Sequence, residues 1–142
     1  MAKVLIVEDQ RDPLKAQESA VENVGKQYCP DLRYDVARCY IDAEAMIPRG
    51  YDIVLLDHRM PIKNMGDLEN TDFKQYCRSL ENIGYALIDK IKRVNPQTVV
   101  IGTSSLSEQE LREQPAPDYV MSKMYGTAEN DLDKILSEVV RH

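Results

Sequence analysis

Short runs of aliphatic and β-branched residues alternate along this chain with longer stretches in which apolar residues recur at helical spacing. Each short run predicts a strand, and each longer stretch predicts a helix. The expected strands, in chain order, cover Lys3 to Val7, Leu32 to Ala37, Asp52 to Leu56, Thr98 to Ile101 and Tyr119 to Ser122. Strands that alternate with helices indicate a parallel sheet with helices on both faces.

Helix ends are indicated by capping residues and prolines. Asp12 is expected to cap the first helix, with Pro13 at its first position. Ser107 and Glu110 have the spacing of a capping box and predict a short helix that ends at Gln114. The expected helices run from Pro13 to Tyr28, through Ala43 to Ile47, from Gly84 to Val94, from Ser107 to Gln114 and from Thr127 to Val140.

These strand–helix units predict a single doubly wound α/β domain over residues 1–142, with a five-stranded parallel sheet in the flavodoxin-like order 2-1-3-4-5. The apolar run from Asp52 to Leu56 suits a central strand that is buried on both faces. In a sheet of this order, ligands bind at the carboxyl ends of strands 1 and 3, where the strand order reverses. The polar residues after these strands are therefore the candidates for chemistry.

Composition and charge narrow the classes of function. The 142 residues are 43% hydrophobic and 30% charged, and no apolar run approaches the ~20 residues that cross a bilayer. Neither a signal peptide nor a membrane anchor is expected. A formal net charge of −6 without a basic stripe argues against direct nucleic-acid binding. Cys29, Cys39 and Cys77 lack metal-ligand spacing, which indicates reduced thiols in a cytoplasmic protein.

Acids, a hydroxyl and a lysine follow four of the expected strands. Strand 1 is followed by Glu8 and Asp9, strand 3 by Asp57, strand 4 by Thr103 and strand 5 by Lys123. Three carboxylates at one edge of a sheet repel one another unless a cation neutralises them, and an all-oxygen set suits Mg²⁺. A lysine and a hydroxyl beside such a cluster indicate phosphoryl transfer to a carboxylate.

Four segments of the chain carry a family resemblance. They are Val-Leu-Ile-Val-Glu-Asp at 4–9, Tyr-Asp-Ile-Val-Leu-Leu-Asp-His-Arg-Met-Pro at 51–61, Val-Ile-Gly-Thr-Ser at 100–104 and Tyr-Val-Met-Ser-Lys at 119–123. In this order, each on the expected strand end, they resemble the CheY-like receiver domains of two-component response regulators. The resemblance covers the chain apart from about residues 62–83.

The resemblance implies a role for each residue of the cluster. Asp57 would accept the phosphoryl group from a histidine kinase, a phosphotransfer protein or a small phosphodonor. Asp9, Asp57 and the backbone carbonyl of Arg59 would bind Mg²⁺ directly, while Glu8 would act largely through water. Thr103 and Lys123 would each contact a phosphoryl oxygen; Ser104 or Ser105 could replace Thr103 if the end of strand 4 lies one residue later.

The chain departs from the family pattern in strand 5. The family usually has proline after the strand-5 lysine, often with a cis peptide bond, whereas Met124 follows Lys123 here. The aromatic residue that usually precedes the lysine by three positions is replaced by Val120, with Tyr119 one residue earlier. Since strand side chains alternate, Tyr119 is expected to point to the opposite face unless a bulge restores it.

Residues 62–83 form an expected insertion between strand 3 and the helix that begins near Gly84. Phe73, Tyr76, Cys77 and Leu80 recur at helical spacing and predict an extra amphipathic helix, with Asn70 or Thr71 as its cap. This helix could dock on the domain as packing. Alternatively, it could bind a partner or form a lid beside Asp57, since long loops at the carboxyl ends of strands are often functional.

The sequence therefore predicts a receiver without an output domain, which catalyses only its own phosphorylation and dephosphorylation. It would signal to a protein partner that the sequence does not identify, with dimerisation on phosphorylation left open. One alternative is a pseudo-receiver that binds partners without using phosphorylation. A haloacid-dehalogenase-like phosphatase would need an Asp where Arg59 stands, and a flavodoxin would need a hydroxyl-rich loop after strand 1.

Overall fold

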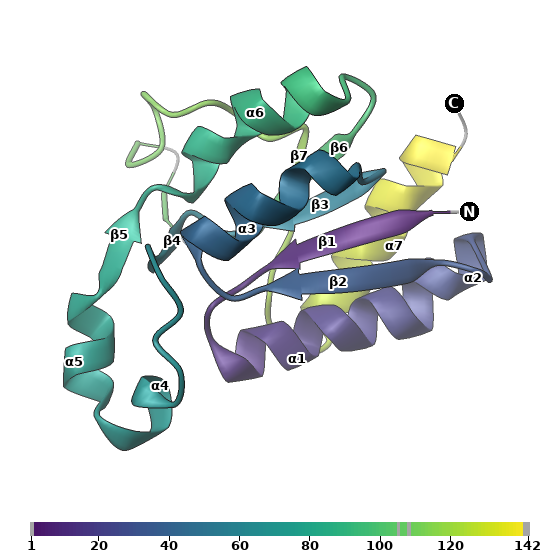
Figure 1. The fold of residues 1–142 in the computed structure, drawn as a ribbon. Helices are drawn as coiled ribbons and strands as arrows, with labels where there is room; N and C mark the ends of the chain where they lie inside the picture. The colour runs from purple at the N-terminus through teal and green to yellow at the C-terminus, as the bar shows by residue number, and fades with distance from the viewer. Residues whose placement is uncertain (1, 105, 108, 141–142) are drawn as a thin grey trace.

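The computed structural model describes residues 2–104, 106–107 and 109–140. Its main sheet is parallel and has the order β2-β1-β3-β6-β7 (Figure 1). The strands are β1 (Lys3–Val7), β2 (Arg33–Ala37), β3 (Ile53–Leu56), β6 (Val99–Gly102) and β7 (Tyr119–Val120). Counted along this sheet alone, the order is 2-1-3-4-5, so the predicted flavodoxin-like arrangement is confirmed, and most of its strand boundaries lie within one residue of those expected.

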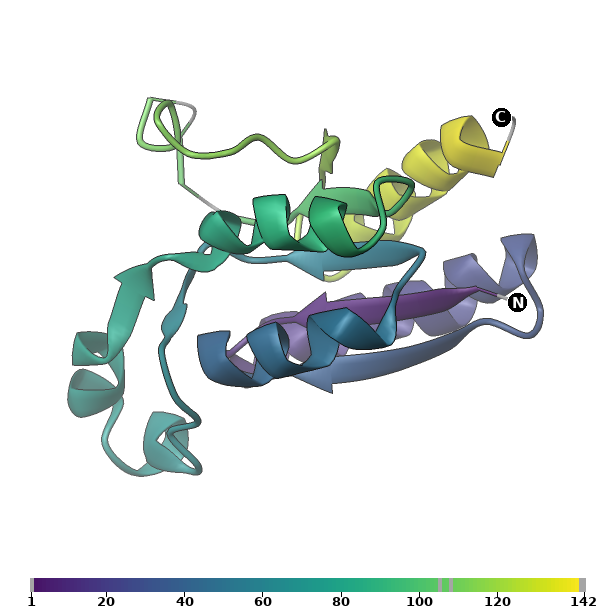
Figure 2. The same cartoon turned by 45° about the horizontal axis from the view of Figure 1, so that its top comes forward.

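Helices cover both faces of the sheet (Figure 2). Along the described residues, the helices are α1 (Arg11–Ala20), the π-helical η1 (Val21–Gly25), α2 (Lys26–Tyr28), α3 (Tyr40–Met46), η2 (Ile47–Arg49), α4 (Leu68–Thr71), α5 (Phe73–Arg78), η3 (Gly84–Ala86), α6 (Leu87–Val94) and α7 (Thr127–Val140). Of these, α4 and α5 lie to one side of the sheet and cover neither face (Figure 1). A separate two-stranded sheet pairs β4 (Arg59–Pro61) with β5 (Leu80–Asn82).

The alternation of side chains along β1 divides the core into two clusters. Val4 and Ile6 pack on one face with residues of α1 and α7, whereas Leu5 and Val7 pack on the other face with residues of α3 and α6. All four side chains are nearly inaccessible to solvent. Burial of each such side chain contributes roughly 1.5–3 kcal/mol, which holds the carboxyl ends of the strands in a fixed register.

The expected cap of the first helix is wrong. The helix begins at Arg11, so Asp12 lies within its first turn, and Gln10 occupies the capping position without a side-chain bond to the backbone. The Arg11 N–H is instead satisfied by the Glu69 carboxylate at 3.1 Å, from a helix distant in sequence. At the other end, the helical stretch stops before the extended Cys29, as predicted.

The expected helix from Ser107 to Gln114 is also wrong in the described residues, since residues 109–113 form turns and residue 108 lies outside them. The capping box itself forms: Ser107 Oγ accepts from the Glu110 N–H at 3.3 Å. Regular helix does not continue because Pro115 and Pro117 follow, and the residue before a proline disfavours helical geometry. Strand β7 is likewise two residues shorter than expected.

The 62–83 segment leaves the sheet and returns beside its own start (Figure 1, lower left). Strands β4 and β5 pair antiparallel in the register of Arg59 with Asn82, which the apolar pattern did not predict. The extra helix is confirmed as α5, but its cap is Asp72, whose carboxylate accepts from the Gln75 N–H at 3.2 Å, so the expected cap at Asn70 or Thr71 is wrong. Leu80 lies in β5, not on the helix.

Two expectations from the sequence concern the cysteines and membrane-spanning helices. The thiols of Cys29, Cys39 and Cys77 are free. No helix in the described part of the chain combines the length and the apolar character that crossing a bilayer requires.

Candidate functional site

Strand register brings the candidate residues to one edge of the sheet. Val7 of β1 pairs with Leu56 of β3, which in turn pairs with Gly102 of β6. The residue that follows each of these strands is polar, and the register places these residues at the same edge of the sheet. Two further backbone bonds extend the ladder past the strands: Asp57 N–H donates to the Val7 carbonyl at 3.2 Å, and Thr103 N–H to the Leu56 carbonyl at 2.9 Å.

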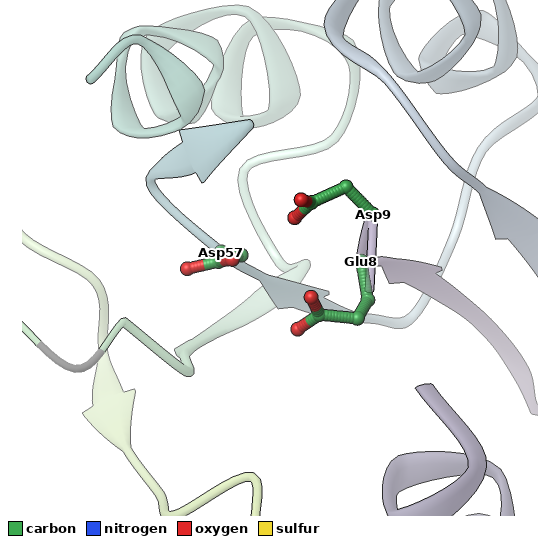
Figure 3. Close-up of side chains that lie close together, drawn as sticks. All are labelled: Glu8, Asp9 and Asp57. Carbon is green, nitrogen blue, oxygen red and sulfur yellow. The ribbon is translucent and has the colours of Figure 1, made fainter. Parts of the chain in front are cut away.

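Glu8, Asp9 and Asp57 converge at this edge (Figure 3). Each offers a carboxylate oxygen, and these oxygens all lie within 4.8 Å of one another. The three residues are 0%, 4% and 2% exposed, respectively. Burial of three neighbouring acids is unfavourable without nearby cations or donors, so the groups that surround them decide what the cluster can bind.

Glu8 is held by protein donors. Its carboxylate accepts from Gln17 Nε2 at 2.9 Å and from the Gln10 backbone N–H at 3.1 Å. Burial is the main cause that raises the pKa of Glu8 to about 8; the charge of Asp57 acts in the same direction, and the Lys123 ammonium opposes both. A carboxylate that is already well bonded suits a water-mediated contact with a metal better than direct ligation.

Asp9 differs from Glu8 because one of its carboxylate oxygens accepts no hydrogen bond from the part of the chain that the structure describes. Tyr76 Oη donates to Asp9 Oδ2, and Arg38 Nη2 donates to the Asp9 backbone carbonyl at 2.7 Å. Asp9 Oδ1 is buried and has no hydrogen-bond partner among the described residues. Burial raises the pKa of Asp9 above its ordinary value, although the Tyr76 hydrogen bond acts in the opposite direction.

Lys123 supplies the compensating positive charge. Its Nζ lies 2.9 Å from Asp57 Oδ2 and 3.3 Å from Glu8 Oε1. Burial alone would lower the pKa of Lys123, but the charges of Glu8 and Asp57 together raise it above its ordinary value, so the ammonium stays protonated. The peptide bond between Lys123 and Met124 is trans, and the lysine reaches Asp57 without the cis bond common in the resembling family.

The remaining Asp57 oxygen is bound by the backbone. His58 N–H donates to Asp57 Oδ1 at 2.8 Å. Burial lowers the pKa of His58, and the ring accepts a hydrogen bond from the Tyr85 N–H through Nδ1 at 2.9 Å. The histidine therefore lies beside the acids as a neutral group that helps to fix the turn after β3.

The site opens into a cavity of about 250 Å³. Its lining residues come from the sheet edge and from the 62–83 segment: Asp9, Gln10, Asp57, Arg59, Cys77, Leu80, Ser104 and Lys123. The donor set fits Mg²⁺, because it consists of oxygens alone and leaves Asp9 Oδ1 unpaired in the described residues. Arg59, whose backbone carbonyl is an expected ligand, lines the same cavity.

Thr103 is placed deeper than Ser104. The Thr103 side chain is 1% exposed, and its Oγ1 has no partner among the described residues, whereas Ser104 lines the cavity. Both residues directly follow β6, so both hydroxyl groups lie at the edge of the sheet that carries the acids. Ser105, the other alternative, lies outside the described residues.

Tyr119 points away from the candidate site, as the alternation of side chains predicted. It pairs with Ile101 in the sheet and packs with the core cluster on the α1 and α7 face. The aromatic residue beside the end of β6 is Tyr85, which is 1% exposed and whose Oη would overlap a Cβ atom placed on Gly102. Tyr85 lies within the helix that was expected from Gly84 to Val94, and the sequence pattern assigned it no role.

Sequence reasoning missed Gln17, Arg38 and the role of Tyr76. Gln17 is fully buried on the core-facing side of α1, and a polar residue on an apolar helix face is a signal that could have been used. Tyr76 was assigned to the apolar face of its helix, and nothing in its spacing shows that its hydroxyl reaches Asp9. That contact depends on how the 62–83 segment folds back.

Comparisons with known proteins give similarity of structure only. No protein-family model matches the sequence, and no curated protein matches it as a relative. The BeF₃-activated receiver domain of DrrB from Thermotoga maritima is 18% identical, with 100% of this chain and 99% of that chain covered and a TM-score of 0.69.

Two further solved structures show the same likeness. The receiver domain of a DNA-binding response regulator from Colwellia psychrerythraea 34H is 17% identical, with 100% of both chains covered and a TM-score of 0.60. The response regulator TrrA from Thermotoga maritima, in complex with Mg²⁺ and BeF, is 19% identical, with 98% of this chain and 99% of that chain covered and a TM-score of 0.61. The expected CheY-like receiver fold is thereby confirmed.

Proposed function

We propose that this chain, which has the fold of response-regulator receiver domains, is a phosphoacceptor in which Asp57 receives the phosphoryl group. The donor would be a phosphohistidine on a histidine kinase or phosphotransfer protein, or a small phosphodonor. One observation carries the proposal: Lys123 Nζ lies 2.9 Å from Asp57 Oδ2 beside two further buried acids. The solved structures with a similar fold are response regulators, and TrrA was solved in complex with Mg²⁺ and BeF. This likeness supports a role for the site in binding Mg²⁺ and a phosphoryl group.

Transfer to Asp57 forms a bond between a carboxylate oxygen and phosphorus. The bond from phosphorus to the donor nitrogen breaks, and its electron pair returns to the imidazole of the donor. Lys123 would pair with a phosphoryl oxygen in place of its present contact with Asp57. The Thr103 hydroxyl, buried without a partner in the described residues, would donate to another oxygen. Hydrolysis by water would later restore the free Asp57.

Mg²⁺, when bound, would offset negative charge on the phosphoryl oxygens during transfer. Asp9, Asp57 and the backbone carbonyl of Arg59 would hold the ion directly, and Glu8 would act through water. Asp9 Oδ1, which has no partner within the described ranges, and the donors that already satisfy Glu8 support this division.

Phosphorylation would act as a signal for a protein partner in the cytoplasm. It adds about −1.5 to −2 charges at the sheet edge and thereby biases the loops after β6 and β7 between two arrangements. Dimerisation of the phosphorylated chain is one form that the readout could take.

Replacement of the acceptor tests the proposal. With Mg²⁺ and acetyl phosphate, we expect intact-mass spectrometry to detect one added phosphoryl group on the wild type and none on Asp57→Asn. The matched control is Asp52→Asn, which changes an exposed acid at the opposite end of β3 and should be phosphorylated like the wild type.

Equal phosphorylation of the wild type and Asp57→Asn would contradict the assignment. A wild type that takes up no phosphoryl group and shows no saturable change on titration with beryllofluoride and Mg²⁺ would favour the pseudo-receiver, which binds partners without this chemistry.

A further inference from the structure

Tyr76 reaches the acid cluster from outside the four segments that carry the family resemblance. It lies in α5, in the middle of the 62–83 segment, and its side chain is 3% exposed. The neighbouring Phe73 on the same helix is 56% exposed, so α5 as a whole is not a buried helix. The one deeply buried ring on α5 is the one whose hydroxyl donates to Asp9 Oδ2.

The hydrogen bond from Tyr76 makes the two carboxylate oxygens of Asp9 different from each other. Oδ2 accepts from Tyr76, whereas Oδ1 is buried without a partner among the described residues. The backbone of the same residue is held by Arg38 Nη2 at 2.7 Å. Asp9 is thus fixed at its backbone and at one carboxylate oxygen, and the other oxygen is left for a ligand.

A second contact keeps the 62–83 segment on this side of the site. Glu69 of α4 accepts from the Arg11 backbone N–H at 3.1 Å and pairs with Arg38 at 4.0 Å. The segment is therefore anchored at the first residue of α1, two residues beyond Asp9. Cys77 and Leu80 of the same segment line the cavity that contains Asp9 and Asp57.

We propose that Tyr76 is a positioning residue for the Mg²⁺ ligand Asp9. Its phenol holds Oδ2 and leaves Oδ1 available to the ion, and it makes the 62–83 segment part of the metal site. The inference rests on the proposed function, because it takes Asp9 as a direct ligand. Groups that hold a metal ligand in this way typically change metal affinity by about 10–100-fold when they are removed.

A phenol that competed with the ion for the carboxylate would weaken binding, and its removal would strengthen it. The free Oδ1 argues for positioning, because the ion need not displace the phenol to reach Asp9.

Calorimetric titration with Mg²⁺ tests the proposal on the full chain. We expect Tyr76→Phe to raise the dissociation constant for Mg²⁺ by about tenfold or more. The matched control is Tyr51→Phe, which removes a phenol that is 4% exposed and donates to the Asp35 carboxylate at 2.7 Å, remote from the acid cluster. This control should bind Mg²⁺ like the wild type, and urea unfolding of all variants without Mg²⁺ monitors their stability.

A second measurement separates positioning from a purely structural role. Binding free energies are reciprocal, so an ion that is favoured by the Tyr76 contact must also favour that contact. We expect Mg²⁺ to slow hydrogen exchange of the α5 backbone amides in the wild type and to have a much smaller effect in Tyr76→Phe.

The outcomes are distinct. If the dissociation constant of Tyr76→Phe for Mg²⁺ were unchanged or lower than that of the wild type, the positioning role would be overturned and the proposed function would remain intact. A wild type that binds Mg²⁺ no better than Asp57→Asn would overturn the metal site and, with it, this inference.

Discussion

At the scale of the residue, the site depends on a close approach of backbone segments that only a residue without a Cβ atom permits. Gly84 begins the turn into α6, and its N–H donates to the His58 carbonyl at 2.8 Å. A Cβ at this position would overlap the Asp57 carbonyl oxygen and lie 2.7 Å from the Met60 Cε. Glycine is required here for space and not for a positive φ, because the backbone of the proposed acceptor passes directly over it.

Gly84→Ala should therefore both destabilise the protein and displace Asp57. We expect the free energy of unfolding in urea to fall by about 1–3 kcal/mol, as overpacking typically causes, together with slower labelling by acetyl phosphate. The control is Gly25→Ala, whose Cβ would meet the flexible end of Leu32 at 3.1 Å. If Gly84→Ala were as stable and as readily labelled as Gly25→Ala, the close approach of the Asp57 backbone to Gly84 would matter neither for stability nor for phosphorylation.

At the scale of the element, the 62–83 segment is a small structure with its own stabilising contacts. Near its end, β5 pairs with β4, the strand that directly precedes the segment, and Asp72 caps α5 through the Gln75 N–H. A helix of six residues is too short to be stable by itself, so its cap and the buried Tyr76 decide whether it stays in place. Contact with Asp9 thus depends on local features of the segment.

Asp72→Ala should loosen α5 without unfolding the domain. Loss of an N-cap costs about 1 kcal/mol, and we expect this cost to appear as faster hydrogen exchange of the α5 amides. Asp67→Ala is the matched control, because Asp67 precedes α4 and makes no side-chain bond to that helix's backbone. Equal exchange in the two variants would show that the cap does not stabilise α5.

At the scale of the whole molecule, phenol hydroxyls of one buried and one partly buried tyrosine join separate elements of the fold. Tyr34 of β2 donates to Glu18 of α1 at 3.0 Å, and Tyr51 before β3 donates to Asp35 of β2 at 2.7 Å. Burial, aided by these carboxylates, raises the pKa of Tyr34 and the pKa of Tyr51 to about 12. The folded protein therefore keeps both protons at a pH where the unfolded chain, with a tyrosine pKa of about 10, has released them.

Stability should consequently fall as the pH rises from about 10 to 12. In this window the unfolded state binds fewer protons than the folded state, so the free energy of unfolding decreases with pH; below about pH 10 the phenols contribute no slope. Urea unfolding at several alkaline pH values should give a shallower decrease for Tyr51→Phe than for the wild type. The same slope in both proteins would contradict the assigned pKa of Tyr51.

The sequence by itself determined the sheet order and which polar residues follow its strands at one edge. Apolar periodicity is local, so β1, β3 and α6 were predictable to within a few residues, and register then places Glu8, Asp57 and Thr103 side by side. Tertiary structure alone decided the rest. Tyr76 meets Asp9, and Glu69 satisfies the start of α1, through contacts that span 67 and 58 residues. Such contacts depend on how a segment folds back in space, which no periodicity records.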